Sequence, residues 1–167
     1  FFFKQKTAYE ISTRDWSSDV CSSDLHPLRW VPIRSLSSQH RERIYEHLLA
    51  LGERDRYLRF GYPAQDTQIA GYVEHIDFVG DEVFGIFNRR LELVAMAHLA
   101  FLRGDGPRTG AEFGVSVLQQ ARGRGLGARL FERAVLHARN RGVDTLVIHA
   151  LTDRKSTRLN SSHEWIS

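Results

Sequence analysis

The feature that most restricts the fold is a glycine-rich turn, ARGRGLGARL at 121–130, between two segments of different character. Before it, EFGVSV at 112–117 has the composition of a strand. After it, apolar residues recur at helical spacing to about residue 141, namely Leu126, Leu130, Ala134 and Ala138. TLVIHA at 145–150 is a continuous apolar run, typical of a strand inside a sheet. We therefore expect a right-handed parallel strand–helix–strand unit.

The residues before this unit predict further strands and helices. Strands are expected at 28–33, 83–87 and 91–101, and two helical stripes are formed by Ile44, Leu48 and Leu51 and by Ile69, Tyr72, Val73 and Ile76. ERDRYLRFGYP at 53–63 is expected to be a polar connector. Within 91–101, one face of the strand should carry Leu91, Leu93, Ala95, Ala97, Leu99 and Phe101. This order predicts one α/β (α+β) domain with a mixed sheet.

The two ends differ from the rest of the chain. No lysine or cysteine lies between His26 and Thr152. DWSSDVCSSD at 15–24 can be encoded by DNA whose complementary strand, read in another frame, encodes DRKSTRLNSS, and this is the sequence at 153–162. That DNA also resembles a sequencing-library adapter. We therefore expect 1–25 and 153–167 to be adapter-derived artefacts, and 26–152 to be the native segment, shortened at its end.

Composition and charge exclude several classes of protein. No run of about eighteen apolar residues is present, and the start has no apolar core of signal-peptide length, so we expect a cytoplasmic protein. The net charge is only +3, and acidic residues are interspersed with the arginines, which argues against a nucleic-acid binder. No His, Cys or carboxylate pair has clear metal-ligand spacing, so no metal is expected.

Several unrelated folds use glycine-rich turns to hold phosphate. A nucleotide P-loop needs Gly-Lys-Ser or Gly-Lys-Thr, whereas this turn continues Gly127-Ala128-Arg129. A dinucleotide fingerprint fits Gly123, Gly125 and Ala128, but the acidic residue it requires after the next strand is Asp153, in the adapter. A tight turn with glycines only for packing is a further reading. A helix N-terminus, close backbone approach at the glycines, and charge from Arg122 and Arg124 together favour a pyrophosphate.

The segment VSVLQQARGRGLGARLFERA resembles the coenzyme A signature of the GNAT superfamily of N-acetyltransferases. Its pattern is carried by Arg122, Gly125 and Gly127, and the element order from Leu28 to Ala150 also matches that family. The resemblance implies a GNAT-like acyl-CoA N-acyltransferase fold without its last helix and strands, and acetyl-CoA as co-substrate. It also implies that the cofactor is held along a splayed strand and by the turn, through Val115, Ser116, Val117, Arg122, Gly123, Arg124, Gly125, Leu126, Gly127 and Ala128.

Acetyl transfer to an amine needs a base, because an amine of pKa about 10.4 is protonated at neutral pH. The resemblance to bacterial GNAT protein-lysine acetyltransferases, shared by ERDRYLRF at 53–60, makes Glu112 the base candidate; the alternative is a surface glutamate at a strand start. His98 and His149 are rival bases, although most histidines on such strands are structural. Without a native cysteine, we expect direct attack in a ternary complex.

The acceptor remains open between protein lysine and a small-molecule amine. The resemblance places the general acid on a helix that the adapter replaces, so none is assigned, and we expect this shortened chain to be inactive. The alternative to an enzyme is a sensor domain that binds acetyl-CoA without turnover.

Overall fold

The computed structural model describes residues 6–12, 31–102 and 110–151 of the 167. The strands are β1 (Lys6–Ser12), β2 (Ile33–Ser35), β3 (Glu82–Phe87), β4 (Leu93–Leu102), β5 (Gly110–Val117) and β6 (Thr145–Leu151). The α-helices are α1 (Arg41–Leu49), α2 (Glu53–Phe60), α3 (Asp66–Glu74) and α4 (Leu126–Asn140), and short 3-10 turns occupy Ser38–His40 and Gln119–Ala121.

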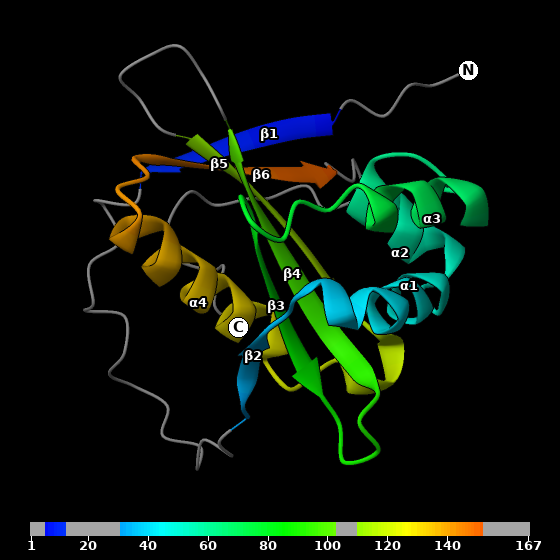
Figure 1. Ribbon diagram of the computed structural model, residues 1–167. Coiled ribbons are helices and arrows are strands. Elements are labelled where there is room, and N and C mark those ends of the chain that lie inside the picture. Colours follow the sequence, from blue (N-terminus) through cyan, green and yellow to red (C-terminus); the bar gives the residue numbers. More distant parts are fainter. Residues whose placement is uncertain (1–5, 13–30, 103–109, 152–167) are drawn as a thin grey trace.

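A mixed sheet with helices on both faces forms the fold (Figure 1). The strand order is β1-β6-β5-β4-β3-β2, and β5 and β6 are parallel while the other neighbours are antiparallel. The helix α4 packs on one face, where Leu130 and Ala134 are buried against β4 and β5. On the other face, α1 and α3 bury Ile44, Leu48 and Ile69. The predicted mixed sheet and the parallel pairing of β5 with β6 are confirmed.

The polar segment at 53–60 is a helix, so the predicted connector is wrong there. No residue of α2 is buried, and a helix without an apolar stripe gives no periodic signal. Arg56 holds it in place by donating to the carbonyls of Leu49, Leu51 and Ala64 and by pairing with Asp66. Gly61, with φ of 80°, ends the helix in the left-handed conformation.

The apolar face predicted for 91–101 is wrong at its start, because β4 contains a bulge. Ile86 pairs with Ala95 and Phe87 with Leu93, so Val94 is an extra residue. Leu93 therefore packs with α1 and α3, whereas Ala95, Ala97, Leu99 and Phe101 pack on the α4 side. Leu91 lies outside the strand and is 57% exposed. The single face predicted for 91–101 holds only from Ala95 onward.

The ends of the sheet also differ from expectation. Residues 28–30 of the strand predicted at 28–33 lie outside the described residues; in the described part, β2 begins at Ile33, directly after Pro32, which has no N–H for a ladder. The strand β1 lies inside the segment assigned to the adapter and pairs in antiparallel register with β6, Lys6 opposite Leu151. The remaining adapter-assigned residues, 1–5, 13–25 and 153–167, lie outside the described residues.

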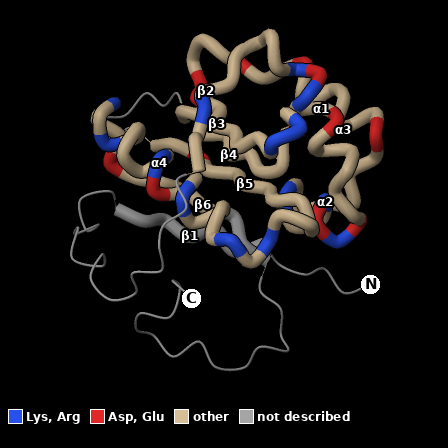
Figure 2. Tube along the Cα trace, turned by 90° about the horizontal axis from the view of Figure 1, so that it is seen from below, with Lys and Arg blue, Asp and Glu red and all other residues tan. Residues whose placement is uncertain are grey.

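The helices α1, α2 and α4 carry charges of both signs, whereas α3 carries only acidic ones (Figure 2). In α2 the acidic residues Glu53 and Asp55 alternate with Arg54 and Arg56. Within the described part of the chain, no helix is both long and apolar enough to cross a membrane.

Candidate active site

The strand β5 has an edge that its neighbour leaves uncovered. It pairs with β4 along its whole length, from Gly110 opposite Leu102 to Val117 opposite Ala95. With β6 it pairs only over Gly110–Phe113. Over the described residues, the parallel ladder therefore stops at Phe113, and the backbone of 114–117 has no partner in β6. The predicted cofactor-binding residues Val115, Ser116 and Val117 lie on this edge, where backbone groups that β6 does not use can pair with an extended ligand.

A buried histidine fixes the back of this edge. His47 of α1 is 2% exposed, and its Nδ1–H donates to the carbonyl of Leu93 at 2.7 Å. Its Nε2 is then an acceptor and receives the Ser116 hydroxyl at 2.8 Å. Burial lowers the pKa of His47 to about 4, so the ring is neutral at pH 7. Because the Ser116 side chain is committed to His47, only its backbone faces a ligand.

The glycine turn leads from this edge into α4. Gly123 and Gly125 have φ of +73° and +67°, in the left-handed region that favours glycine. Gly125 is the N-cap of α4 and makes no side-chain capping hydrogen bond. The first N–H groups of α4 are thus available to an anion. A Cβ at either glycine would meet no atom within 4 Å, so backbone conformation rather than crowding requires them.

The other turn residues differ in what they can offer. Leu126 is 5% exposed and packs in the core, so it contributes only backbone. Arg124 and Ala128 are exposed. Arg122 is paired with Asp55 of α2, with 2.6 Å between Nη2 and Oδ1, and its Nε and Nη2 donate weakly to the Val117 carbonyl at 3.4 Å. This arginine lies between the uncovered edge and the helix N-terminus, where a pyrophosphate would need it.

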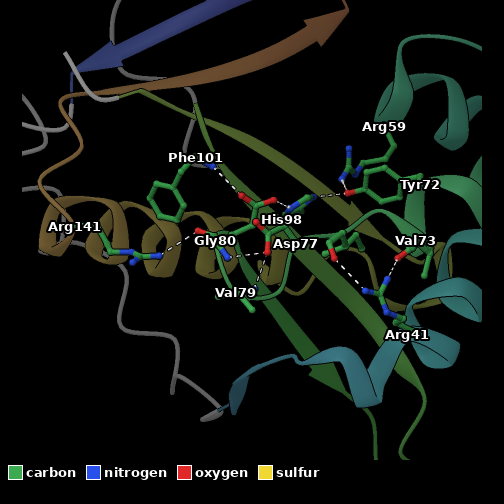
Figure 3. A network of polar contacts seen from close by, with 12 residues as sticks. Arg41, Arg59, Tyr72, Val73, Asp77, Val79, Gly80, His98, Phe101 and Arg141 are labelled. Atoms are coloured by element: carbon green, nitrogen blue, oxygen red, sulfur yellow. Dashed lines mark hydrogen bonds and ion pairs between the residues drawn. The ribbon is translucent and has the colours of Figure 1, made fainter. Parts of the chain in front are cut away.

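Glu112 lies on the opposite side of β5 from the α4-facing Phe113. The face on which it lies carries a polar network that includes Arg59, Tyr72 and His98 (Figure 3). Glu112 pairs across the sheet with Ala100, and the neighbouring pair on the same face is Gly114 with His98. The charge of Glu112 contributes to the pKa values of both His98 and Tyr72, so the three groups share one environment. The structure thus brings the base candidate and one rival base together.

His98 uses both ring nitrogens inside the network. The Tyr72 hydroxyl donates to Nδ1 at 2.6 Å, and Nε2–H donates to Asp81 at 3.0 Å. Burial lowers its pKa, and the Asp81 carboxylate opposes this. Neither nitrogen is therefore available to take a proton from an amine in this arrangement. The side chain of His149, the other rival, lies outside the described residues.

Sequence reasoning missed most of this network. Arg59, Tyr72 and Asp81 come from α2, α3 and the segment before β3, and no spacing in the sequence links them to Glu112. The resemblance of ERDRYLRF was the one signal available, and Arg59 lies in that segment. Among the described residues, no group of three His, Cys, Asp or Glu side chains could hold a metal ion.

Comparisons with known proteins agree with this geometry. The family model described as "Acetyltransferase (GNAT) family" matches residues 24–159. The GNAT domain of S. lividans PAT superposes with a TM-score of 0.62 at 22% identity, covering 74% of this chain and 73% of that one. A predicted acetyltransferase of Clostridium acetobutylicum, solved with acetyl-CoA, gives 0.57 at 14% identity, covering 83% and 95%.

A third similar structure is described as a transcriptional regulator from Bacillus halodurans C-125. It superposes with a TM-score of 0.54 at 23% identity, covering 83% of this chain and 98% of that one. No curated protein matches the sequence. At these identities the structures show the fold, while the family model covers most of the chain. The chain therefore belongs to the acetyltransferase (GNAT) family.

Proposed function

We propose that the native protein is an N-acetyltransferase that transfers the acetyl group of acetyl-CoA to a primary amine by direct attack in a ternary complex. The observation that carries this proposal is the geometry of β5. Its partner β6 leaves it after Phe113, and its free edge leads directly into the uncapped N-terminus of α4. An extended ligand with an anionic group at one end can therefore pair with the backbone of β5 and place its anion at the N-terminus of α4.

In this proposal the pantetheine arm pairs with the backbone of Val115, Ser116 and Val117. The pyrophosphate lies on the N–H groups of the turn, from Gly123 to Ala128, with Arg122 and Arg124 supplying charge. The fit is supported by the two left-handed glycines, because the space around a Cβ at either one is open to 4 Å and a ligand can approach the backbone there. Acetyl-CoA supplies an activated acyl group when bound.

Glu112 is proposed to remove the proton from the acceptor ammonium. The neutral amine then attacks the thioester carbonyl carbon, so that a C–N bond forms and the C–S bond breaks. The second amine proton leaves as the amide forms, and coenzyme A departs as the thiol. Overall, an ammonium and acetyl-CoA give an amide, coenzyme A and one proton. Both His98 nitrogens are engaged by Tyr72 and Asp81, and the resemblance to the protein-lysine acetyltransferases assigns the role of base to Glu112.

Protein lysine is the acceptor class that the resemblance of Glu112 and ERDRYLRF favours over a small-molecule amine. We also propose that 26–152 is the native segment and that the flanking residues are adapter-derived. Sequencing the genomic locus across Thr152–Asp153 tests this boundary. A locus that encodes DRKSTRLNSS at this point would overturn it. The gene product read from that locus is called the full-length product below.

Binding of acetyl-CoA tests the cofactor site. Titration calorimetry should show that Arg122→Gln weakens binding about tenfold or more, because a charge-assisted phosphate contact is lost. Arg90→Gln, an exposed arginine in the β3–β4 turn, is the matched control and should bind like the wild type. Equal affinity of the Arg122 variant and the wild type would contradict the assignment of the turn.

A sensor that binds acetyl-CoA without turnover is the second candidate, favoured by the similar fold of the Bacillus halodurans transcriptional regulator. Thiol release from acetyl-CoA by the full-length product, measured over a panel of peptide lysines, polyamines and amino sugars, separates the two. Amine-dependent release supports the enzyme. Tight binding with no release over the whole panel supports the sensor.

A further inference from the structure

Arg59 lies where the reaction would occur, and this inference rests on the proposed function. If the pantetheine arm pairs with 115–117, its thioester comes to lie beside Gly114, where β5 leaves β6. Glu112 is two residues earlier on the same face of the strand. The amine that attacks the thioester and gives its proton to Glu112 must therefore lie close to Gly114, on the face of the sheet that carries α2.

The guanidinium of Arg59 already packs against this point. A Cβ placed at Gly114 would lie 2.6 Å from the Arg59 Cζ and from Nη1, closer than real contacts allow. The glycine at 114 is thus explained by the arginine that covers it. A positive charge is held against the backbone at the position where the two strands separate.

A directional chain of hydrogen bonds fixes this guanidinium (Figure 3). Arg59 Nη2–H donates to the Tyr72 hydroxyl at 2.6 Å, and that hydroxyl donates to His98 Nδ1 at 2.6 Å. His98 Nε2–H donates to Asp81 Oδ2 at 3.0 Å, and Asp81 Oδ1 accepts the Phe101 N–H at 3.2 Å. Each hydrogen bond in this series has one direction, so His98 is the neutral tautomer that carries its proton on Nε2.

Stability alone does not explain the arrangement. The Arg59 Nε is buried and has no hydrogen-bond partner in the described part of the chain. Buried donors left unpaired are costly, and most structural arginines avoid them. The ring faces of Phe60 and Tyr72, each 5.3 Å from Cζ, complete its surroundings. A charged group kept partly unsatisfied at the reacting position suggests a role in the chemistry.

We propose that Arg59 is the fixed positive charge that opposes protonation of the acceptor amine at Glu112, and that Tyr72, His98 and Asp81 are its positioning residues. A like charge a few ångströms from an ammonium disfavours the charged form, so the amine becomes nucleophilic at a lower pH. This addresses the main obstacle to the reaction, the protonation of free amines at neutral pH.

The other titratable groups around Arg59 come from each element packed against it. They are His47 of α1, Tyr72 of α3, Asp81 before β3, His98 of β4 and Glu112 of β5. Burial lowers the pKa of both histidines and raises that of Tyr72, so these three are neutral between pH 6.5 and 9. Among the described residues, the other ionisable side chains of this environment are Arg59, Asp81 and Glu112.

The test is the pH dependence of kcat for the full-length product at saturating acetyl-CoA and lysine peptide, since kcat reports groups in the bound complex. Arg59→Gln should raise the apparent pKa on the acid side of the profile by about one pH unit, which lowers kcat about tenfold below that pKa and spares it at high pH. Arg59→Lys keeps the charge and should retain the wild-type profile. Arg54→Gln, an exposed arginine of the same helix, is the matched control.

The outcomes separate the inference from the function on which it rests. If Arg59→Gln lowers kcat by the same factor at every pH, Arg59 is only structural and the inference is overturned. An unchanged profile overturns it as well. If the wild type binds acetyl-CoA but acetylates no amine, the proposed enzymatic function is wrong, and so is the inference that rests on it. Tyr72→Phe removes the hydroxyl that holds Arg59 and should give a smaller shift in the same direction.

Discussion

Replacing Glu112 by glutamine is expected to lower the turnover of the full-length product by about 10²- to 10⁴-fold, the usual contribution of a general base. The amide has the shape of the carboxylate but cannot accept the ammonium proton. The affinity for acetyl-CoA should stay the same, because the proposed contacts of the pantetheine arm use the backbone of 115–117. Thiol release measures the first quantity and titration calorimetry the second.

Two comparisons make this expectation specific to Glu112. Glu132→Gln alters an exposed glutamate of α4 and should leave turnover unchanged. If the Glu112 variant keeps wild-type turnover at pH 7, Glu112 is the surface glutamate of the alternative reading. A parallel loss of acetyl-CoA binding would instead mean that the substitution disturbs β5 itself.

Acidification should destabilise the protein through His47. Its pKa in the folded state is about 4, below the 6.5 of the unfolded chain, so the unfolded state binds the proton more readily. The stability that the neutral ring contributes is therefore complete above pH 6.5 and is lost as the pH falls toward 4. A shift of this size corresponds to about 3 kcal/mol in the free energy of unfolding. Protonation would also place a donor opposite the Ser116 hydroxyl, at the back of the cofactor edge.

Urea unfolding between pH 7 and pH 4 measures this loss. His47→Gln should be less stable than the wild type at pH 7 and should show a weaker pH dependence, because the amide does not titrate. His75→Gln, a change at an exposed histidine, serves as the control and should follow the wild type. An equal loss of stability with acid in the His47 variant and the wild type would assign the effect to other groups.

The parts of the fold that the sequence predicts well are those with a strong local signal. The glycine turn, the amphipathic α4 and the apolar β6 are each defined by residues that are near neighbours in the chain. The helix α2 has no such signal, because Arg56 holds it through carbonyls that only the folded structure brings together. The bulge at Val94 is likewise a property of two strands, and it reverses the face of Leu93.

The candidate site likewise has a part with a local sequence signal and a part without one. The left-handed conformation of the glycine turn could be predicted because Gly123 and Gly125 lie close together in the chain and such angles favour glycine. The network on the face of Glu112 could not be predicted, because Arg59, Tyr72, Asp81 and His98 come from four separate segments of the chain. Ser116 illustrates the limit, since its place in the cofactor strand was predicted but not the use of its hydroxyl by His47.

The helix α2 contacts both the proposed cofactor turn and the proposed amine site. Asp55 and Arg59 are four residues apart on this helix, so both side chains lie on one face. Asp55 is paired with Arg122 of the cofactor turn, and Arg59 packs on Gly114 beside the base candidate. In the proposed complex, a pyrophosphate would compete with Asp55 for Arg122, and Asp55 belongs to the same helix as Arg59. If binding at the two proposed sites is coupled through α2, linkage requires reciprocity: the factor by which acetyl-CoA raises the affinity for the amine is the factor by which the amine raises the affinity for acetyl-CoA.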